Sequence, residues 1–296
     1  MKEWMNSPVS PRTQSLYGLI RANGGKRILL AQQESPRRDF SDAEMDYLLR
    51  TTGRLPAVRG LDFIHNDFRG VVERAVRWND RGGIVTICWH TGVSGIGYPD
   101  SKDEFPDFDA LLTAGTPENA LLRRRWEDAA LALRRLQDMD IPVLWRPFHE
   151  FDGQWFWWGK GGGARFIALW RMMHDCFTRE YGLNNLLWVL GYADDVRHGW
   201  YPGDDCCDIL GSDTYRGVTT HASSFRRLRA INEEKPLAFH ECGKLPAPDD
   251  FFRDRAVWSW VMPWHSRWLM QDNTPERICQ IYRDERMITL DELKGF

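Results

Sequence analysis

The chain has 296 residues, with 42 acidic and 39 basic side chains and a formal net charge of −3. This length allows one large domain or two ordinary ones, and the balanced charge gives no bulk attraction to nucleic acid or to an anionic membrane. No apolar run approaches the ~20 residues that span a bilayer, and the polar stretch 1–14 lacks the apolar core of a signal peptide. We therefore expect neutral partners, with no nucleic acid and no membrane among them.

Apolar, β-branched segments of strand length alternate with helical patterns along the chain. The expected strands are 28–31, 56–61, 83–89, 142–146, 186–190, 209–212, 236–239 and 256–262. The expected helices are 41–50, 68–80, 117–139, 164–180, 223–231 and 275–283. The third helix has the strongest start signal, because Thr116 can cap it and Pro117 fits its first position. The stretch after the fifth strand has a weak helical pattern, so we expect a short or degraded helix there.

Eight strands alternating with helices predict the α/β class and a single (β/α)8 TIM barrel. We expect one catalytic domain over 1–296, with 1–27 as an N-terminal extension packed on the barrel. A doubly wound open sheet is the alternative, but it usually carries a glycine-rich turn after the first strand, where this chain has Gln32, Gln33 and Glu34. No linker or repeat divides the chain.

The cysteine and histidine patterns favour neither a metal site nor a disulfide framework. The six cysteines include no CxxC pair and have no regular spacing. His90 and His149 also lack the helical HxxxH or HExxH spacing of zinc sites. We therefore expect no cofactor and no metal.

One segment concentrates reactive and aromatic side chains. The fourth expected strand ends in Arg146, and His149, Glu150 and Asp152 follow within six positions, before Trp155 and two further tryptophans. A carboxylate can protonate a departing glycosidic oxygen, and tryptophan faces stack on the C–H faces of sugars. The alternative is a strand end and an aromatic loop that pack the core. A core does not accept so many charged groups unless each finds a partner, so we favour a sugar-cleaving cleft.

Polar side chains also follow most of the other expected strands, and in a barrel the carboxyl ends of the strands meet at one rim. These positions are Asp62, His90, Arg146 to Glu150, Asp213 to Tyr215, His240 to Gly243 and Trp264 to His265. Glu150 and Glu241 would face each other across this rim. If their carboxyl groups lie ~5 Å apart, the geometry is that of a retaining glycosidase, with Glu150 as acid/base and Glu241 as nucleophile.

The neighbours of the two glutamates suggest supporting roles. The charge of Glu241 would keep Glu150 protonated until a glycosyl ester forms. Tyr215 could donate a hydrogen bond to Glu241, and Arg146 could position charge. The alternative is that both glutamates are ion-paired and only stabilise the rim.

Aromatic and imidazole side chains are the candidate sugar contacts. His90 and His149 suit hydrogen bonds to sugar hydroxyls or to the catalytic carboxylates. Of four candidate sugar platforms, we expect two to contact sugar and two to pack beneath the cleft; the four are Trp155, Trp157, Trp158 and Trp264.

From Leu30 to Leu293 the chain resembles glycoside hydrolase family 26, whose best-known members are endo-β-1,4-mannanases. The resemblance is most specific around Glu150, because the family carries its acid/base glutamate after a histidine and five positions before a tryptophan. The segments 89–90, 201–215 and 235–243 are similar to the family's third-strand histidine, its sixth-strand tyrosine and its nucleophile strand, and Trp264 falls at the place of its eighth-strand tryptophan.

The resemblance implies a retaining mechanism, no obligatory metal and a β-linked polysaccharide or oligosaccharide as substrate. It assigns Glu150 and Glu241 to catalysis. It assigns substrate binding to His90, Arg146, His149, Trp155, Tyr215 and Trp264. It also implies secretion, whereas the chain itself shows no signal peptide, which leaves a cytoplasmic location open. We expect a monomer.

Two departures from the family leave the substrate open. The chain lacks the Asn-Pro that many family mannanases carry after the third-strand histidine and has a long acidic loop there, and His265 stands where several members have arginine. The first reading is an endo-mannanase acting on mannan, glucomannan or galactomannan. The alternatives are a mixed-linkage β-glucanase, a β-1,3-xylanase, an exo-acting mannobiohydrolase if the loop 95–108 blocks one end of the cleft, and a non-catalytic carbohydrate-binding barrel.

Overall fold

The computed structural model describes residues 9–36 and 42–293. Residues 1–8 of the expected N-terminal extension, Ser41 at the start of the first expected helix, and 294–296 lie outside the described part. Among the described residues, none of the helices has the length and apolar character that crossing a lipid bilayer requires.

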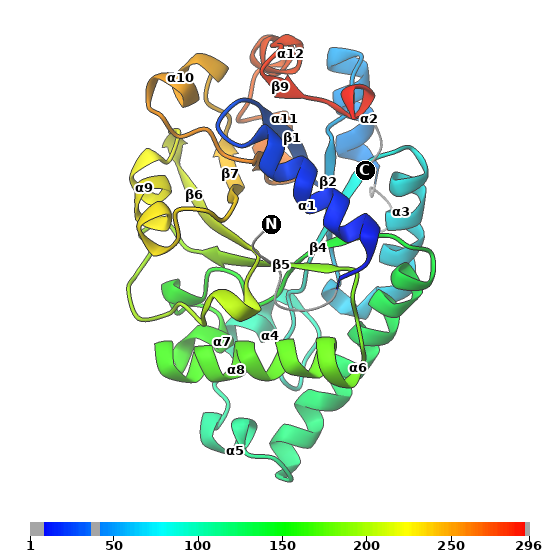
Figure 1. Ribbon diagram of the computed structural model, residues 1–296, viewed down its shortest axis with the longest axis vertical. Helices are drawn as coiled ribbons and strands as arrows, with labels where there is room; N and C mark the ends of the chain where they lie inside the picture. Colours follow the sequence, from blue (N-terminus) through cyan, green and yellow to red (C-terminus); the bar gives the residue numbers. More distant parts are fainter. Residues whose placement is uncertain (1–8, 37–41, 294–296) are drawn as a thin grey trace.

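Eight parallel strands form a closed barrel (Figure 1). Each strand pairs with the next, and β1 pairs with both β2 and β8, which closes the ring. The strands are β1 (Ile28–Gln33), β2 (Val58–Asp62), β3 (Ile84–Cys88), β4 (Val143–Arg146), β5 (Leu186–Tyr192), β6 (Ile209–Val218), β7 (Leu237–Lys244) and β8 (Trp260–Pro263). The expected (β/α)8 fold is confirmed.

Helices connect the strands and surround the barrel. The principal ones are α2 (Ala43–Thr52), α3 (Phe68–Asp80), α6 (Pro117–Asp138), α8 (Gly163–Asp175), α9 (Ala222–Ile231), α10 (Pro248–Arg253), α11 (Arg267–Met270) and α12 (Pro275–Arg283). Short helices in the loops after β3 and β4 are α4 (Tyr98–Asp103), α5 (Phe108–Leu112) and α7 (Trp157–Lys160). Thr116 caps α6 by accepting a hydrogen bond from the Asn119 amide, as its sequence predicts.

Several elements differ from expectation. The helix expected over 164–180 turns into a π-helix at Cys176–Glu180. The connection between β5 and β6, where a short or degraded helix was expected, contains only a 3-10 turn at Asp204–Cys206. The last barrel strand begins at Trp260 rather than at 256, because the Trp258 amide donates a 3.1 Å hydrogen bond to the Ala256 carbonyl and the chain turns there. A short ninth strand, β9 (Met287–Ile288), pairs with β1 and was not predicted.

Two apolar layers hold the barrel together. The inner layer fills the barrel with inward-facing strand residues such as Leu29, Leu144 and Trp260, and α1 (Pro11–Asn23) packs on it through Leu16 and Ile20. Figure 1 shows α1 lying across the barrel. The outer layer joins the opposite faces of the strands to the surrounding helices. Inward-facing side chains at the strand starts are therefore apolar, and the chemistry is left to the strand ends.

Candidate active site

Two glutamates meet at the carboxyl ends of β4 and β7. Glu150 follows β4, and Glu241 lies within β7 beside Asp213 of β6. One carboxylate oxygen of each of these three residues lies within 4.8 Å of the others. This separation matches the ~5 Å carboxyl spacing of retaining glycosidases and is shorter than the ~6.5–9.5 Å spacing of inverting ones.

The loop after β4 aims Glu150 and Trp155 at each other. Glu150 has a left-handed backbone with φ of 54°, and its amide donates a 2.6 Å hydrogen bond to the Gly191 carbonyl. Gln154 is also left-handed, with φ of 64°, and turns the chain back, so that the Trp155 indole N–H donates to Glu150 Oε2 at 2.8 Å. The Trp155 ring lies against Gly153, where a Cβ would come within 2.2 Å of it, so this turn requires glycine.

Glu241 is held at both carboxylate oxygens. Arg146 Nη1 donates to Oε1 at 2.6 Å, and the Tyr215 hydroxyl donates to Oε2 at 2.7 Å. Arg146 also pairs with Asp213 and has no exposed surface. A Cβ at Gly191 would lie 2.8 Å from Arg146 Nε, so β5 needs glycine beside the guanidinium. Arg146 therefore lies beneath the cavity and contacts the two carboxylates.

The surroundings of the two glutamates differ. Burial and the charge of Glu241 raise the pKa of Glu150 to about 7, against the opposite effects of Arg146, the Trp155 hydrogen bond and His90. Glu241 instead accepts two hydrogen bonds, one of them from a guanidinium. Glu150 can therefore hold a proton near neutral pH, which suits a general acid.

A chain of polar side chains reaches Glu241 from β2 and β3. Asp62 Oδ2 lies 2.6 Å from His90 Nδ1, and His90 Nε2 lies 3.0 Å from His149 Nε2. Burial lowers the pKa of His90, but the charge and hydrogen bond of Asp62 outweigh it and raise the pKa overall. Burial and the positive Arg146 lower the pKa of His149. The two imidazoles share a hydrogen bond between their Nε2 atoms, and His149 Nε2 lies 3.9 Å from Glu241 Oε1.

These residues surround a cavity of about 410 Å³. Its wall includes both glutamates and four of the residues expected to bind substrate, which are His90, His149, Tyr215 and Trp264. The remaining two lie at its edges. Arg146 is buried below the carboxylates, and Trp155 borders a second cavity that also contains Glu150.

The tryptophans expected as platforms divide into two pairs. Trp157 and Trp158 are fully buried, and their indole N–H groups donate to the carbonyls of Thr91 and His149 at 2.8 Å. These two pack beneath the cleft. Trp155 is 41% exposed and Trp264 is partly exposed, so these two are available to a ligand.

Five further residues of the site were not among the predicted site residues. Asp62 and Asp213 supply buried carboxylates, and Tyr98, Phe156 and Trp268 line the first cavity. The sequence placed both aspartates at strand ends but gave neither a role in the site. Tyr98 and Trp268 lie in the short helices α4 and α11, and Phe156 directly precedes α7. The sequence pattern of such short segments gives no direction to a side chain. Tyr98 is at the start of α4 in the acidic loop after β3, with its ring centroid 5.3 Å from that of His90.

Two groups of side chains have the composition of a metal site, namely Asp62 with Cys88 and His90, and Glu150 with Asp213 and Glu241. In the first, His90 Nδ1 is hydrogen-bonded to Asp62. In the second, Arg146 forms ion pairs with both Asp213 and Glu241. Both groups of ligand atoms thus already contact side chains of the protein.

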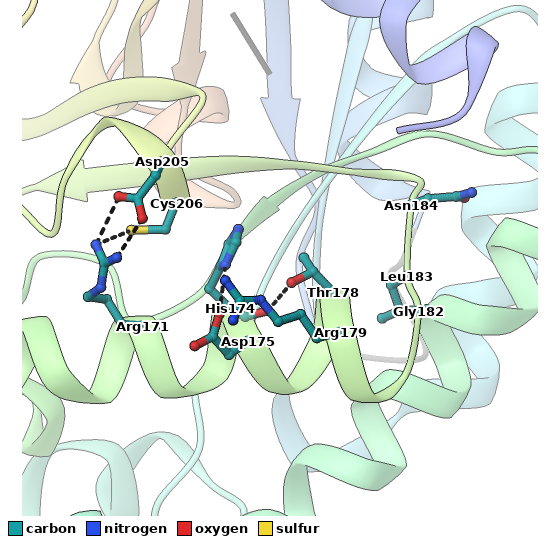
Figure 2. Close-up of a pocket in the computed structure, with 10 residues that line it drawn as sticks. All are labelled: Arg171, His174, Asp175, Thr178, Arg179, Gly182, Leu183, Asn184, Asp205 and Cys206. Carbon is teal, nitrogen blue, oxygen red and sulfur yellow. Dashed lines mark hydrogen bonds and ion pairs between the residues drawn. The ribbon is translucent and has the colours of Figure 1, made fainter. Parts of the chain in front are cut away.

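Another hollow, of about 490 Å³, lies away from the barrel mouth against α8 and the π-helix. Figure 2 shows Arg171 reaching from α8 to Asp205, with which it forms a 2.9 Å hydrogen bond. The ten residues that line it include no tryptophan, tyrosine or phenylalanine. Its ion pairs are already satisfied within the protein, and we assign no catalytic role to it.

Comparison with known proteins identifies the family. The model of glycosyl hydrolase family 26 matches residues 5–292. A mannan endo-1,4-beta-mannosidase of Thermothelomyces thermophilus is 33% identical over 99% of this chain and 64% of its own length. Mannan endo-1,4-beta-mannosidase B of Piromyces sp is 28% identical over 99% of this chain and 54% of its own length. The chain thus spans between half and two thirds of these relatives.

Solved structures agree in fold. The beta-mannanase from a symbiotic protist of the termite Reticulitermes speratus, complexed with gluco-manno-oligosaccharide, superposes with a TM-score of 0.90 at 31% identity, covering 99% of this chain and 98% of that one. The Podospora anserina GH26-CBM35 beta-(1,4)-mannanase also gives 0.90, at 29% identity, with 98% and 69% covered. The chain therefore belongs to glycosyl hydrolase family 26.

Proposed function

We propose that this protein is a retaining endo-β-1,4-mannanase that cleaves mannan, glucomannan or galactomannan. The observation that carries the mechanism is the pair of carboxylates within 4.8 Å, of which Glu241 is held by Arg146 and Tyr215 while Glu150 has a pKa of about 7. The substrate rests on the mannanase relatives and on the gluco-manno-oligosaccharide bound by one structural neighbour. We further propose that the chain forms one catalytic domain and acts as a monomer.

In the first step, a carboxylate oxygen of Glu241 attacks the anomeric carbon while the bond from that carbon to the glycosidic oxygen breaks. Glu150 gives its proton to the departing oxygen, so the leaving sugar ends with a hydroxyl group and Glu150 becomes ionised. Tyr215 and Arg146 hold the attacking carboxylate ionised and oriented. The product of this step is a glycosyl ester on Glu241.

In the second step, the ionised Glu150 removes a proton from water, and the water oxygen attacks the anomeric carbon as the ester bond breaks. Glu241 is uncharged as an ester, so its repulsion no longer raises the pKa of Glu150. Two displacements restore the original configuration at the anomeric carbon, and both carboxyl groups return to their starting states.

The remaining predicted residues would bind the substrate. His90 and His149 line the first cavity beside Glu241 and would contact hydroxyl groups of the attacked sugar. Trp264 offers a partly exposed ring for stacking, and Trp155 combines an exposed ring with its hydrogen bond to Glu150. Arg146, with no exposed surface, would act by positioning Glu241 and not by touching sugar.

Two alanine variants test the catalytic pair. We expect Glu150→Ala and Glu241→Ala to abolish turnover of β-mannan without unfolding, whereas the exposed control Glu285→Ala keeps normal rates. With an aryl β-mannobioside that has a good leaving group, azide should restore part of the activity of both variants. The azide product should have the α configuration from the Glu241 variant and the β configuration from the Glu150 variant. Near-normal mannan turnover in either variant, or inverted sugar from the wild type, contradicts the proposal.

The substrate is tested by product profiles on mannohexaose, galactomannan, lichenan and β-1,3-xylan. An endo-mannanase releases several chain lengths from mannohexaose and leaves the last two polymers intact. Release of mannobiose alone indicates an exo-acting mannobiohydrolase, and faster cleavage of lichenan or xylan identifies the corresponding glucanase or xylanase.

A further inference from the structure

A second cavity, of about 500 Å³, lies beyond Glu150. Glu150 and Tyr215 line both the first and the second cavity, whereas Glu241 lines only the first. A smaller hollow of about 270 Å³ continues from the second cavity and shares Asp194 and Arg216 with it. The cleft therefore passes over the acid/base and continues along the ends of β5 and β6.

In a retaining glycosidase the leaving-group sugars lie on the acid/base side of the cleaved bond, which is the side of the second cavity. We propose that Arg216, held there by its ion pair with Asp194, binds hydroxyl groups of these sugars. This inference rests on the proposed function. The nucleophile bonds to the sugar whose anomeric carbon is attacked, so that sugar occupies the cavity containing Glu241. The acid touches the oxygen between the two sugars, so the next sugar lies on the other side of Glu150.

Hydrogen bonds within the protein hold the wall of the second cavity in place. Asp152 is buried, and its carboxylate accepts hydrogen bonds from the amides of Ala193 at 2.7 Å and Arg197 at 2.9 Å. Ser224 of α9 donates to the Asp194 carbonyl at 2.6 Å. The loop after β5 is thus fixed from both sides, and it presents the Asp194 side chain to the end of β6.

The two sides of the cleft have different chemistry. The first cavity is lined by several rings, among them Tyr98, Phe156 and Trp268, whereas the second contains one ring besides the shared Tyr215, that of Trp155. Its other side chains are largely charged. Besides the Trp155 ring, such a surface recognises sugars through their hydroxyl groups, which donate to carboxylates and accept from guanidinium N–H groups.

The guanidinium of Arg216 is available to hydroxyl groups in this cavity. It forms an ion pair with Asp194 through Nε, and its side chain is 74% exposed. Within the described part of the chain its Nη atoms form no hydrogen bond. A sugar in the second cavity would supply acceptors for these N–H groups.

The test compares a long substrate with one that lacks leaving-group sugars. Mannopentaose fills both cavities, whereas 2,4-dinitrophenyl β-mannobioside places sugar only on the nucleophile side. For Arg216→Ala, we expect the ratio of kcat/KM on mannopentaose to kcat/KM on the aryl substrate to fall about tenfold, since a hydrogen bond to a charged group is lost. The matched control is Arg69→Ala on α3, an 86% exposed arginine paired with Glu73, which should leave the ratio unchanged.

Each outcome decides the inference. If Arg216→Ala loses kcat/KM equally on both substrates, Arg216 supports the fold or the catalytic pair. If kcat/KM stays normal on both, no leaving-group sugar contacts Arg216. Either result leaves the ratio unchanged and overturns the assignment. The midpoint of urea unfolding, measured for both variants, separates loss of folding from loss of binding. A wild-type protein that cleaves neither substrate would instead overturn the proposed function.

Discussion

Replacing Glu150 with glutamine should stabilise the protein, relative to the wild type, far more at pH 8 than at pH 5. The structure raises the pKa of this carboxyl to about 7, first through burial and then through the charge of Glu241. Ionising Glu150 in the folded protein is therefore unfavourable, although the same group ionises freely in the unfolded chain. A glutamine has nearly the same shape and cannot ionise, so it removes this cost.

The size of the effect follows from the two pKa values. An unfolded glutamate has a pKa near 4.5, and that of folded Glu150 is about 7. Below pH 4.5 both states hold the proton, and between the two values only the folded state does, so stability falls as the pH rises through this window. At about 1.4 kcal/mol for each pH unit, the wild type loses roughly 3 kcal/mol that Glu150→Gln retains.

Urea unfolding followed by tryptophan fluorescence measures this difference at pH 5, 6, 7 and 8. The free energy of unfolding of Glu150→Gln minus that of the wild type should grow across this range and level off above pH 7. Other buried carboxyls with a raised pKa, among them Glu34, Asp208 and Asp213, are present in both proteins. Glu285→Gln, at an exposed position, should show a constant difference from the wild type. If the difference for Glu150→Gln is also constant, Glu150 ionises as an ordinary glutamate and the assignment of the acid is wrong.

Three further changes test the neighbours of the pair. Trp155→Phe removes a hydrogen bond that lowers the pKa of Glu150, so the alkaline limb of kcat/KM should move to higher pH; a shift to lower pH would contradict this. Tyr215→Phe removes the 2.7 Å hydrogen bond to Glu241 and should lower kcat on an aryl β-mannobioside about 10- to 100-fold, so a loss below twofold would exclude the contact from catalysis. Asp152→Ala leaves two loop amides unpaired and should lower the free energy of urea unfolding by about 2–4 kcal/mol, with a smaller loss for Asp152→Asn; equal stability would show that water replaces the carboxylate.

The local sequence pattern predicted the barrel and placed the two glutamates at its rim. Alternating strand and helix periods specify βα units, and in a closed barrel every strand end reaches the same rim. Glu150 and Glu241 could therefore be placed near each other although 91 positions separate them in the chain, by subtraction of their residue numbers. The sequence analysis did not predict helix α1, although Ser10 and Pro11 are typical of a helix start. This helix is stabilised by its packing on the barrel, which the local sequence pattern does not show.

Only the tertiary structure decided what each rim residue contacts. The sequence from Trp155 to Trp158 does not show which ring faces the cleft. The left-handed backbone of Gln154 turns the chain, and the absence of a side chain at Gly153 leaves room for the Trp155 ring. Arg146 could not be separated from the sugar-binding residues until the structure showed it fully buried. The sequence by itself determined which chemical groups reach the barrel mouth, because strand ends are set by local periodicity. Burial, side-chain direction and protonation depend on atoms brought together from distant strands, so the fold alone determined them.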